Sequence, residues 1–139
     1  MFALFLLGSH LERIDGIHPA GSGKEIILVI LTLFTTALYV AACLIHEAGH
    51  ALAAQCFGLP WKLRMGWMGP YVRVQGRYRW HENAIVALTG PAASLAGAWA
   101  CWHAGLPYCG SIVGAIGVGN LLPVRYSDMR NALEALKLR

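Results

Sequence analysis

The segment Ile26–His50, IILVILTLFTTALYVAACLIHEAGH, determines how the rest of the chain is interpreted. Its first twenty residues, 26–45, carry no charge. A helix of this length can cross the roughly 30 Å core of a bilayer. The segment ends in an HExxH pattern. Residues four apart share a helix face, so His46 and His50 can direct two imidazoles at one ion. Glu47 is close enough to act as a base on water at that ion, and this chemistry is typical of zinc.

The same pentapeptide has another interpretation, a helix whose histidines make ordinary hydrogen bonds while Glu47 is solvated. Composition bears on the choice, since the chain is 57% hydrophobic and only 13% charged, against roughly 25% charged in soluble domains. No charged residue occurs between Glu25 and Glu47, or between Glu82 and Arg125. These stretches indicate a membrane protein, in which ionisable groups at membrane depth are costly and usually functional.

We therefore expect an all-α membrane protein with a core of three transmembrane helices and a short β-hairpin-like loop between the first two. The expected parts of this single domain, 1–139, are an N-terminal segment (1–24), a first transmembrane helix (25–57), a basic β-prone loop (61–80), a second helix (84–105), a third helix (110–130) and a tail (131–139), which looks like a short amphipathic helix. Gly58-Leu59-Pro60 is expected to end the first helix.

The loop 61–80 alternates basic and apolar residues, and the alternation is broken at Gln75-Gly76. Alternation of this kind predicts a β-hairpin. A plain interfacial loop with basic anchors is the alternative.

The two later helices contain breaks. Gly90-Pro91 is expected to kink the second, and the small residues that follow, 92–98, favour close helix packing rather than chemistry. Asn120-Leu121-Leu122-Pro123 is expected to break the third, and Asp128 follows that break. His103 is interpreted as an interfacial side chain rather than a ligand. The four cysteines have no zinc-finger spacing and predict no disulfide framework.

Basic residues give the orientation. The net charge of +4 does not indicate nucleic acid, because the Lys and Arg residues fall in loops beside apolar spans. Five lie in the loop 61–80 and four in the C-terminal segment, whereas the turn between the second and third spans has none. The positive-inside rule therefore predicts a multi-pass integral membrane protein whose HExxH and Asp128 both lie toward the cytoplasmic side.

Two motifs in this order resemble the site-2 protease family of intramembrane zinc metalloproteases. HExxH matches His46, Glu47 and His50, and the family's Asn-x-x-Pro-x-x-x-x-Asp pattern matches Asn120, Pro123 and Asp128. The Gly-Pro of the family's second core helix matches Gly90-Pro91, and the basic loop with glycine resembles 65–74. The resemblance covers roughly 26–128, a minimal three-helix core.

The resemblance implies an intramembrane zinc endopeptidase that cleaves a membrane-anchored protein in or near a transmembrane segment. It implies that His46, His50 and Asp128 hold Zn²⁺, that Glu47 is the general base, and that Asn120 contacts the substrate backbone or the oxyanion. The sequence does not indicate an oligomeric state.

The chain departs from the family pattern at two positions, where Met129 replaces the usual glycine and Ser94 stands where the family often has asparagine. These departures leave open a catalytically inactive relative that acts as a binding or regulatory partner in the membrane. Two further alternatives are a metal-handling membrane protein and a soluble zinc protease, against which the uncharged segment 26–45 argues.

Overall fold

The computed structural model describes residues 22–66, 69–76, 79–124 and 127–137. This part of the chain is mostly helical, with one small antiparallel sheet. Its elements are α2 (Ser22–Cys56), β1 (Trp61–Gly66), β2 (Gly69–Val74), α3 (Trp80–His103), α4 (Pro107–Leu121) and α5 (Asp128–Lys137). The chain divides into two compact units, Met1–Thr35 and Thr36–Arg139, and all the contacts discussed below lie within the second. The expected N-terminal segment lies outside the described residues up to position 21.

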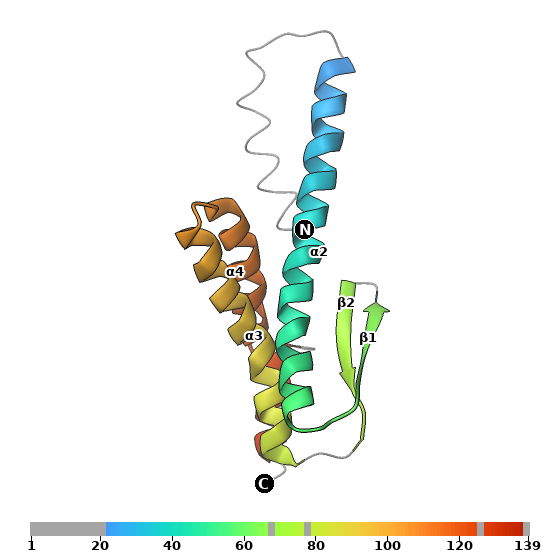
Figure 1. The fold of residues 1–139 in the computed structure, drawn as a ribbon, viewed down its shortest axis with the longest axis vertical. Helices are drawn as coiled ribbons and strands as arrows, with labels where there is room; N and C mark the ends of the chain where they lie inside the picture. Colours follow the sequence, from blue (N-terminus) through green and yellow to red (C-terminus); the bar gives the residue numbers. More distant parts are fainter. Residues whose placement is uncertain (1–21, 67–68, 77–78, 125–126, 138–139) are drawn as a thin grey trace. The chain divides into compact units, whose positions relative to one another are not determined.

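Helix α2 ends where the sequence predicts. The N–H of Gly58 donates to Gln55 O at 3.0 Å and the N–H of Leu59 donates to Ala54 O at 2.8 Å. This pair of bonds is the Schellman motif, which needs a left-handed residue just past the helix. Gly58 supplies it, with φ of +66°. The motif turns the chain sharply from α2 into β1, so the strands return along the last turns of α2 (Figure 1).

The predicted hairpin is present. β1 and β2 pair in register from Trp61 with Val74 to Gly66 with Gly69, so the strands are joined between these two glycines. The expected break at Gln75-Gly76 is not the connection within the hairpin, because it follows the second strand. β2 is the strand nearer to α2 in Figure 1. All six residues of β1 are exposed, whereas Pro70 of β2 is buried and Val72 is half-buried. The hairpin thus turns one strand toward the helices and leaves the other outside.

Helix α3 packs through its small residues, as predicted. Its buried positions follow a helical repeat along one face. They are Ala84, Val86, Ala87, Gly90, Pro91, Ser94 and Ala98. Large apolar side chains on the rest of the helix are exposed, among them Leu88, Leu95 and Trp99, which are 39%, 40% and 64% accessible. Small residues inside and large apolar residues outside are typical of a helix that meets lipid on its outer side.

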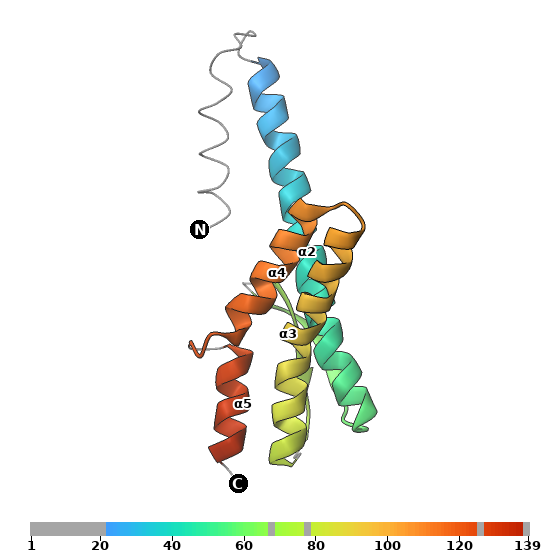
Figure 2. The same ribbon diagram turned by 90° about the vertical axis from the view of Figure 1, so that its left-hand side faces the viewer.

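Helices α4 and α5 complete the second unit. Both pack against α3 (Figure 2), and Ala42, Ala98 and Val113 form a small buried core between α2, α3 and α4. The expected boundaries need correction here. The helix expected over 110–130 is instead the shorter α4, which stops at Leu121, so the break expected at 120–123 is confirmed. The amphipathic helix expected over 131–139 corresponds to α5, which begins earlier, at Asp128. Ser127 starts α5 as its cap, because its Oγ accepts the N–H of Arg130 at 3.2 Å.

In the described part of the chain, two helices, Gly23–Cys56 and Trp80–His103, are long and apolar enough to cross a membrane. α4 has 15 residues. Its length is about 22 Å at 1.5 Å per residue, which is short of a roughly 30 Å hydrocarbon core. A core of three full spans is therefore not seen, and two helices have the length for it.

Candidate metal centre

The HExxH segment places two imidazoles side by side near the end of α2. His46 and His50 are one helical turn apart and are 4% and 8% exposed. Their Nε2 atoms are 3.3 Å apart, and the rings meet edge to face with centroids separated by 4.9 Å. Together with Glu47 they form a group whose ligand atoms lie within 4.8 Å of one another and which could hold a metal ion.

Asp128 reaches the same point from α5. Its Oδ2 is 2.8 Å from Nε2 of His46 and 3.4 Å from Nε2 of His50. Burial raises the pKa of the Asp128 carboxyl, but the hydrogen bonds and charges of the two histidines lower it by more, so the pKa lies below its ordinary value. Asp128 is therefore a carboxylate at neutral pH, and it brings a negative charge to the two imidazoles.

The second nitrogen of each imidazole is bonded to α3. His50 Nδ1 is 2.6 Å from the main-chain oxygen of Val86, and because a carbonyl only accepts, His50 must carry its proton on Nδ1. His46 Nδ1 is 3.0 Å from Oγ of Ser94, which is fully buried. Metal-binding histidines usually make such a bond from the ring nitrogen that faces away from the metal. In neutral His50, Nε2 is thus a lone pair aimed at the site.

The three atoms form a triangle that fits a tetrahedral ion. Bonds of about 2.0–2.1 Å at tetrahedral angles separate neighbouring ligand atoms by about 3.3 Å. The sides of the observed triangle are 3.3, 3.4 and 2.8 Å. Two nitrogens and a carboxylate oxygen are also a donor set that zinc accepts. Acceptors that converge in a buried place need a cation or a proton between them, so the residues present fit a zinc ion.

Glu47 lies beside this triangle and is held from the hairpin. Its Oε2 accepts the main-chain N–H of Val72 at 2.5 Å. A hydrogen bond from a main-chain N–H to a carboxylate oxygen restricts the direction in which that side chain points. It fixes a carboxylate of α2 to β2, a contact between segments that are 25 residues apart in the chain.

The close approach of α2 and α3 depends on two glycines. A Cβ at Gly49 would meet Ala93 Cβ at 2.8 Å, and it would overlap the main chain of Thr89. A Cβ at Gly90 would lie 2.8 Å from Nε2 of His46 and overlap the ring of His50. The Gly-Pro glycine is therefore the place where α3 passes directly beside both imidazoles.

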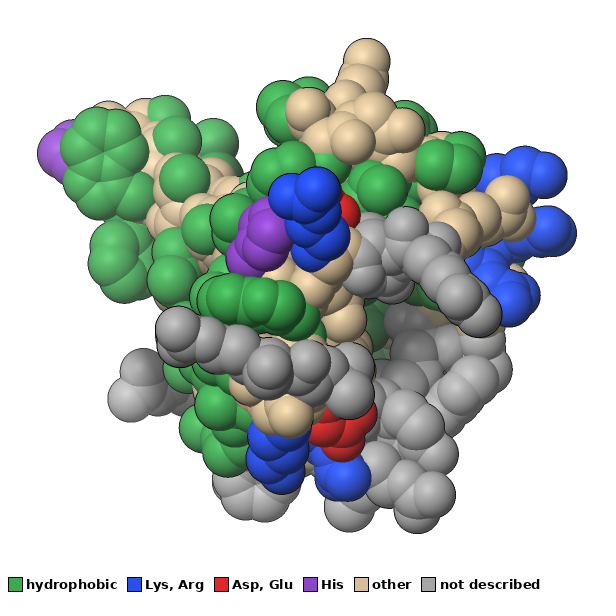
Figure 3. All heavy atoms as spheres, turned by 90° about the horizontal axis from the view of Figure 1, so that it is seen from below, with side chains coloured by type: hydrophobic (Ala, Val, Ile, Leu, Met, Phe, Trp, Pro, Cys, Tyr) green, Lys and Arg blue, Asp and Glu red, His purple; other side chains and the backbone are tan. Residues whose placement is uncertain are grey.

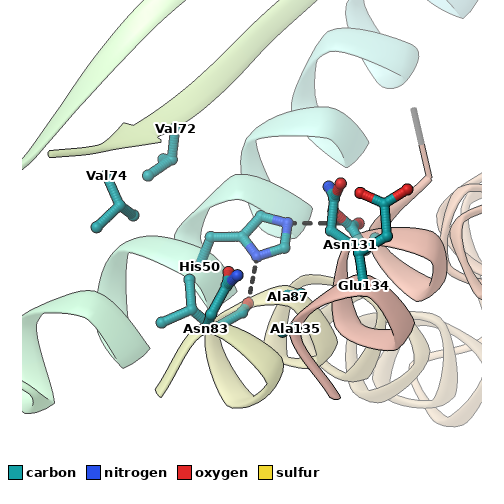
Figure 4. Close-up of a pocket in the computed structure, with 10 residues that line it drawn as sticks. His50, Val72, Val74, Asn83, Ala87, Asn131, Glu134 and Ala135 are labelled. Atoms are coloured by element: carbon teal, nitrogen blue, oxygen red, sulfur yellow. Dashed lines mark hydrogen bonds and ion pairs between the residues drawn. The ribbon is translucent and has the colours of Figure 1, made fainter. Parts of the chain in front are cut away.

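A pocket of about 400 Å³ opens next to His50. Two carboxamides, Asn83 from α3 and Asn131 from α5, line the pocket together with His50, and Val72 and Val74 of β2 line it from the hairpin (Figure 4). The remaining lining residues are Val86, Ala87, Asp128, Glu134 and Ala135. The volume is in the range of ligand sites, and the combination of apolar walls with a few polar groups is typical of them.

The structure brings together four of the five predicted site residues, His46, Glu47, His50 and Asp128. Asn120 is different, because it lies on α4, its Nδ2 donates to Ile116 O at 3.1 Å, and it is not among the residues that line the pocket. Met129 lies in the first turn of α5, where any residue adopts the helical backbone. His103 packs against Trp99 near the end of α3, with ring centroids 4.3 Å apart and the ring planes tilted by 55°.

Sequence reasoning missed the residues that orient the histidines and the base. Ser94 was assigned to packing alone, yet it also bonds His46. Its only signal in the sequence was that it replaces a residue that is often asparagine in the family. The main-chain groups of Val86 and Val72 have no sequence signal, because every residue carries a carbonyl and nearly every residue an N–H.

Comparison of the chain with models of protein families, with curated proteins and with solved structures found no match. The resemblance to site-2 proteases therefore rests on the sequence motifs alone.

Proposed function

We propose that the chain is a zinc endopeptidase, a minimal member of the site-2 protease family that cleaves a membrane-anchored protein in or near a transmembrane segment. One observation carries this proposal. Two imidazoles of HExxH and a carboxylate from a helix 82 residues away converge on one point, with sides of 3.3, 3.4 and 2.8 Å. The residue that HExxH proteases use as their base lies beside that point.

In this proposal His46, His50 and Asp128 hold the zinc ion. Zinc when bound lowers the pKa of water toward neutrality and polarises the scissile carbonyl. Glu47 takes the proton of the water and delivers it to the leaving amine nitrogen. Ser94 and the carbonyl of Val86, which contact the Nδ1 atoms, would keep the Nε2 lone pairs directed at the ion. The role of Asn120 toward the oxyanion stays a prediction from the resemblance.

We propose further that the protein spans the membrane more than once, with the centre toward the cytoplasmic side. Two helices have the length and composition, and α3 exposes large apolar side chains. Viewed from the end where α3 begins and α5 finishes, Lys and Arg side chains outnumber acidic ones (Figure 3). A reporter fused after Lys137 should be active only in the cytoplasm; activity on the other side would reverse the orientation.

The substrate strand is proposed to lie against β2. A transmembrane helix hides its peptide bonds in its own hydrogen bonds, so it must unwind locally before cleavage. β2 lies beside the centre, and its residues Val72 and Val74 line the pocket next to His50. The N–H of Val72 is bonded to Glu47, and the other main-chain groups of β2 that point away from β1 can pair with an extended peptide.

The proposal is tested with purified protein in detergent, loaded with zinc, and fluorescein-labelled casein as the probe substrate. The Glu47→Gln variant keeps the shape of the side chain and an oxygen that can accept the Val72 N–H, but it lacks a base. We expect it to retain zinc and to cleave casein about 100-fold more slowly or worse than wild type.

The outcomes separate the proposal from its alternative. Cleavage by wild type that a zinc chelator abolishes, and that Glu47→Gln nearly removes, supports the protease. Equal cleavage by both proteins would reject Glu47 as the base. Zinc binding without cleavage of casein, or of a panel of single-span membrane proteins, would favour the inactive relative that acts as a binding partner.

A further inference from the structure

Glu47 is near enough to the centre to become a metal ligand itself. Its carboxylate oxygen belongs to a group in which all ligand atoms lie within 4.8 Å of one another. Carboxylates bind zinc at about 2.0–2.2 Å, and a fourth protein ligand would close the site to water. A protease needs the opposite arrangement, with three protein ligands and one open position. Something must therefore hold this carboxylate outside the coordination sphere.

The register of the hairpin shows what holds it. The N–H of Gln75 donates to Pro60 O at 2.8 Å, so it points toward the β1 side of the hairpin. Residues 60 and 75 belong to the same antiparallel ladder in which Leu63 is opposite Val72. Because main-chain groups alternate in direction along an antiparallel strand, Val72 directs its N–H away from β1. That N–H donates to Glu47 Oε2 at 2.5 Å. The N–H of Val72 therefore makes no hydrogen bond to β1, and it can donate to the carboxylate.

We propose that the main-chain N–H of Val72 is a positioning group that keeps Glu47 out of the metal coordination sphere, so that the fourth position stays open to water. The inference rests on the proposed function and deepens it. A main-chain donor in a paired strand has little freedom of its own, unlike a side chain, so it can fix the carboxylate while leaving the second oxygen free for water. The hairpin would thereby position the catalytic base as well as the substrate strand.

The strand permits a test that removes this single hydrogen bond. Val72→Pro deletes the outward N–H and no bond between the strands. Proline is already accepted at the equivalent outward position two residues earlier, Pro70, which is buried. Val74→Pro is the matched control, because it deletes the next outward N–H of the same strand, which makes no bond to Glu47. An amide-to-ester replacement at Val72 removes the N–H without a ring and serves if the proline variant does not fold.

The probe is Co²⁺ in place of zinc, read by its visible d–d absorption in detergent-purified protein. We expect Val72→Pro to bind one Co²⁺ with bands shifted from wild type, as the Glu47 carboxylate enters the sphere, and to hold the metal more tightly. Adding Glu47→Gln to Val72→Pro should restore the wild-type bands, because a carboxamide is a poor ligand. Val74→Pro should keep the wild-type bands and affinity.

The inference fails if Val72→Pro, or the ester variant, is folded and binds Co²⁺ with the wild-type bands and affinity. It also fails if the shift persists when Glu47→Gln is added, because Glu47 would not be its cause. Failure of the wild type to bind either metal is a different result, which overturns the proposed function itself.

Discussion

Three acceptor atoms meet at the centre, the Nε2 atoms of His46 and His50 and Oδ2 of Asp128, and neighbouring groups orient the two imidazoles. His50 has no choice of tautomer, because its Nδ1 faces the carbonyl of Val86. His46 faces the hydroxyl of Ser94, which can donate or accept. A hydroxyl that accepts from Nδ1–H leaves the Nε2 lone pair of His46 available to a cation. Ser94 therefore bears on metal affinity more directly than its small size suggests.

Substituting Ser94 by Ala should weaken zinc binding by about 10–100-fold, the range found when such partners of ligand histidines are removed. The packing should survive, because only one atom is lost from a fully buried position. The measurement is a zinc titration against a competing chelator. Ser111→Ala is the control, since its Oγ donates only to Pro107 O at an exposed position. Equal affinities in the two variants would show that Ser94 serves packing alone.

The sequence predicts the metal ligands and the base, but it does not predict the groups that hydrogen-bond to them and orient them. His46, Glu47, His50 and Asp128 follow from two spaced motifs, and the structure brings them together. Asn120 was assigned with them, but its carboxamide bonds within its own helix. The partners Val86 O and Val72 N–H belong to the main chain, and only the three-dimensional path of the backbone selects them.

At the scale of elements, the centre depends on how closely α3 passes α2. Gly90 marks the closest point, since a Cβ there would overlap the ring of His50 and come within 2.8 Å of His46 Nε2. Gly97, two turns further along α3, is less crowded. A Cβ there would meet the side-chain ends of Ile45 and Val113 at 3.3 and 3.4 Å, and these can move.

Gly90→Ala should therefore displace both imidazoles, weaken zinc binding and lower the free energy of unfolding by about 1–3 kcal/mol, as overpacking usually does. Gly97→Ala makes the same chemical change in the same helix and should leave zinc binding near wild type. Chelator competition and thermal unfolding in detergent measure the two effects. If both variants bind zinc equally, the contact of Gly90 with the imidazoles does not constrain the centre.

Element boundaries were predictable where local chemistry decides them. Gly58 ends α2 as expected, because only a left-handed residue completes the Schellman motif. Pro123 likewise follows the end of α4. The short amphipathic helix expected over 131–139 corresponds to α5, which begins three residues earlier, at Asp128. Its cap is Ser127, whose Oγ accepts the N–H of Arg130.

Across the described part of the chain, the candidate metal ligands, the base and their hydrogen-bond partners lie in one region. The centre is assembled from α2, α3 and α5, with β2 beside it, and it lies within the compact unit Thr36–Arg139. Composition predicts a mostly helical protein with membrane-spanning segments. The described part of the chain is mostly helical, and two of its helices are long and apolar enough to cross a membrane. Composition does not predict that α4 would be too short for a full span, since hydropathy measures apolar content and not where a helix breaks.

The central claim is that His46, His50 and Asp128 form one zinc site, and the metal content of detergent-purified protein tests it without any substrate. We predict about one zinc per chain in wild type, as three protein ligands imply, and a large loss in Asp128→Ala. Glu134→Ala, which removes another carboxylate of α5 that is bonded instead to Arg130, should keep its zinc. Wild-type protein without zinc after supplementation, or Asp128→Ala with wild-type affinity, would contradict the account.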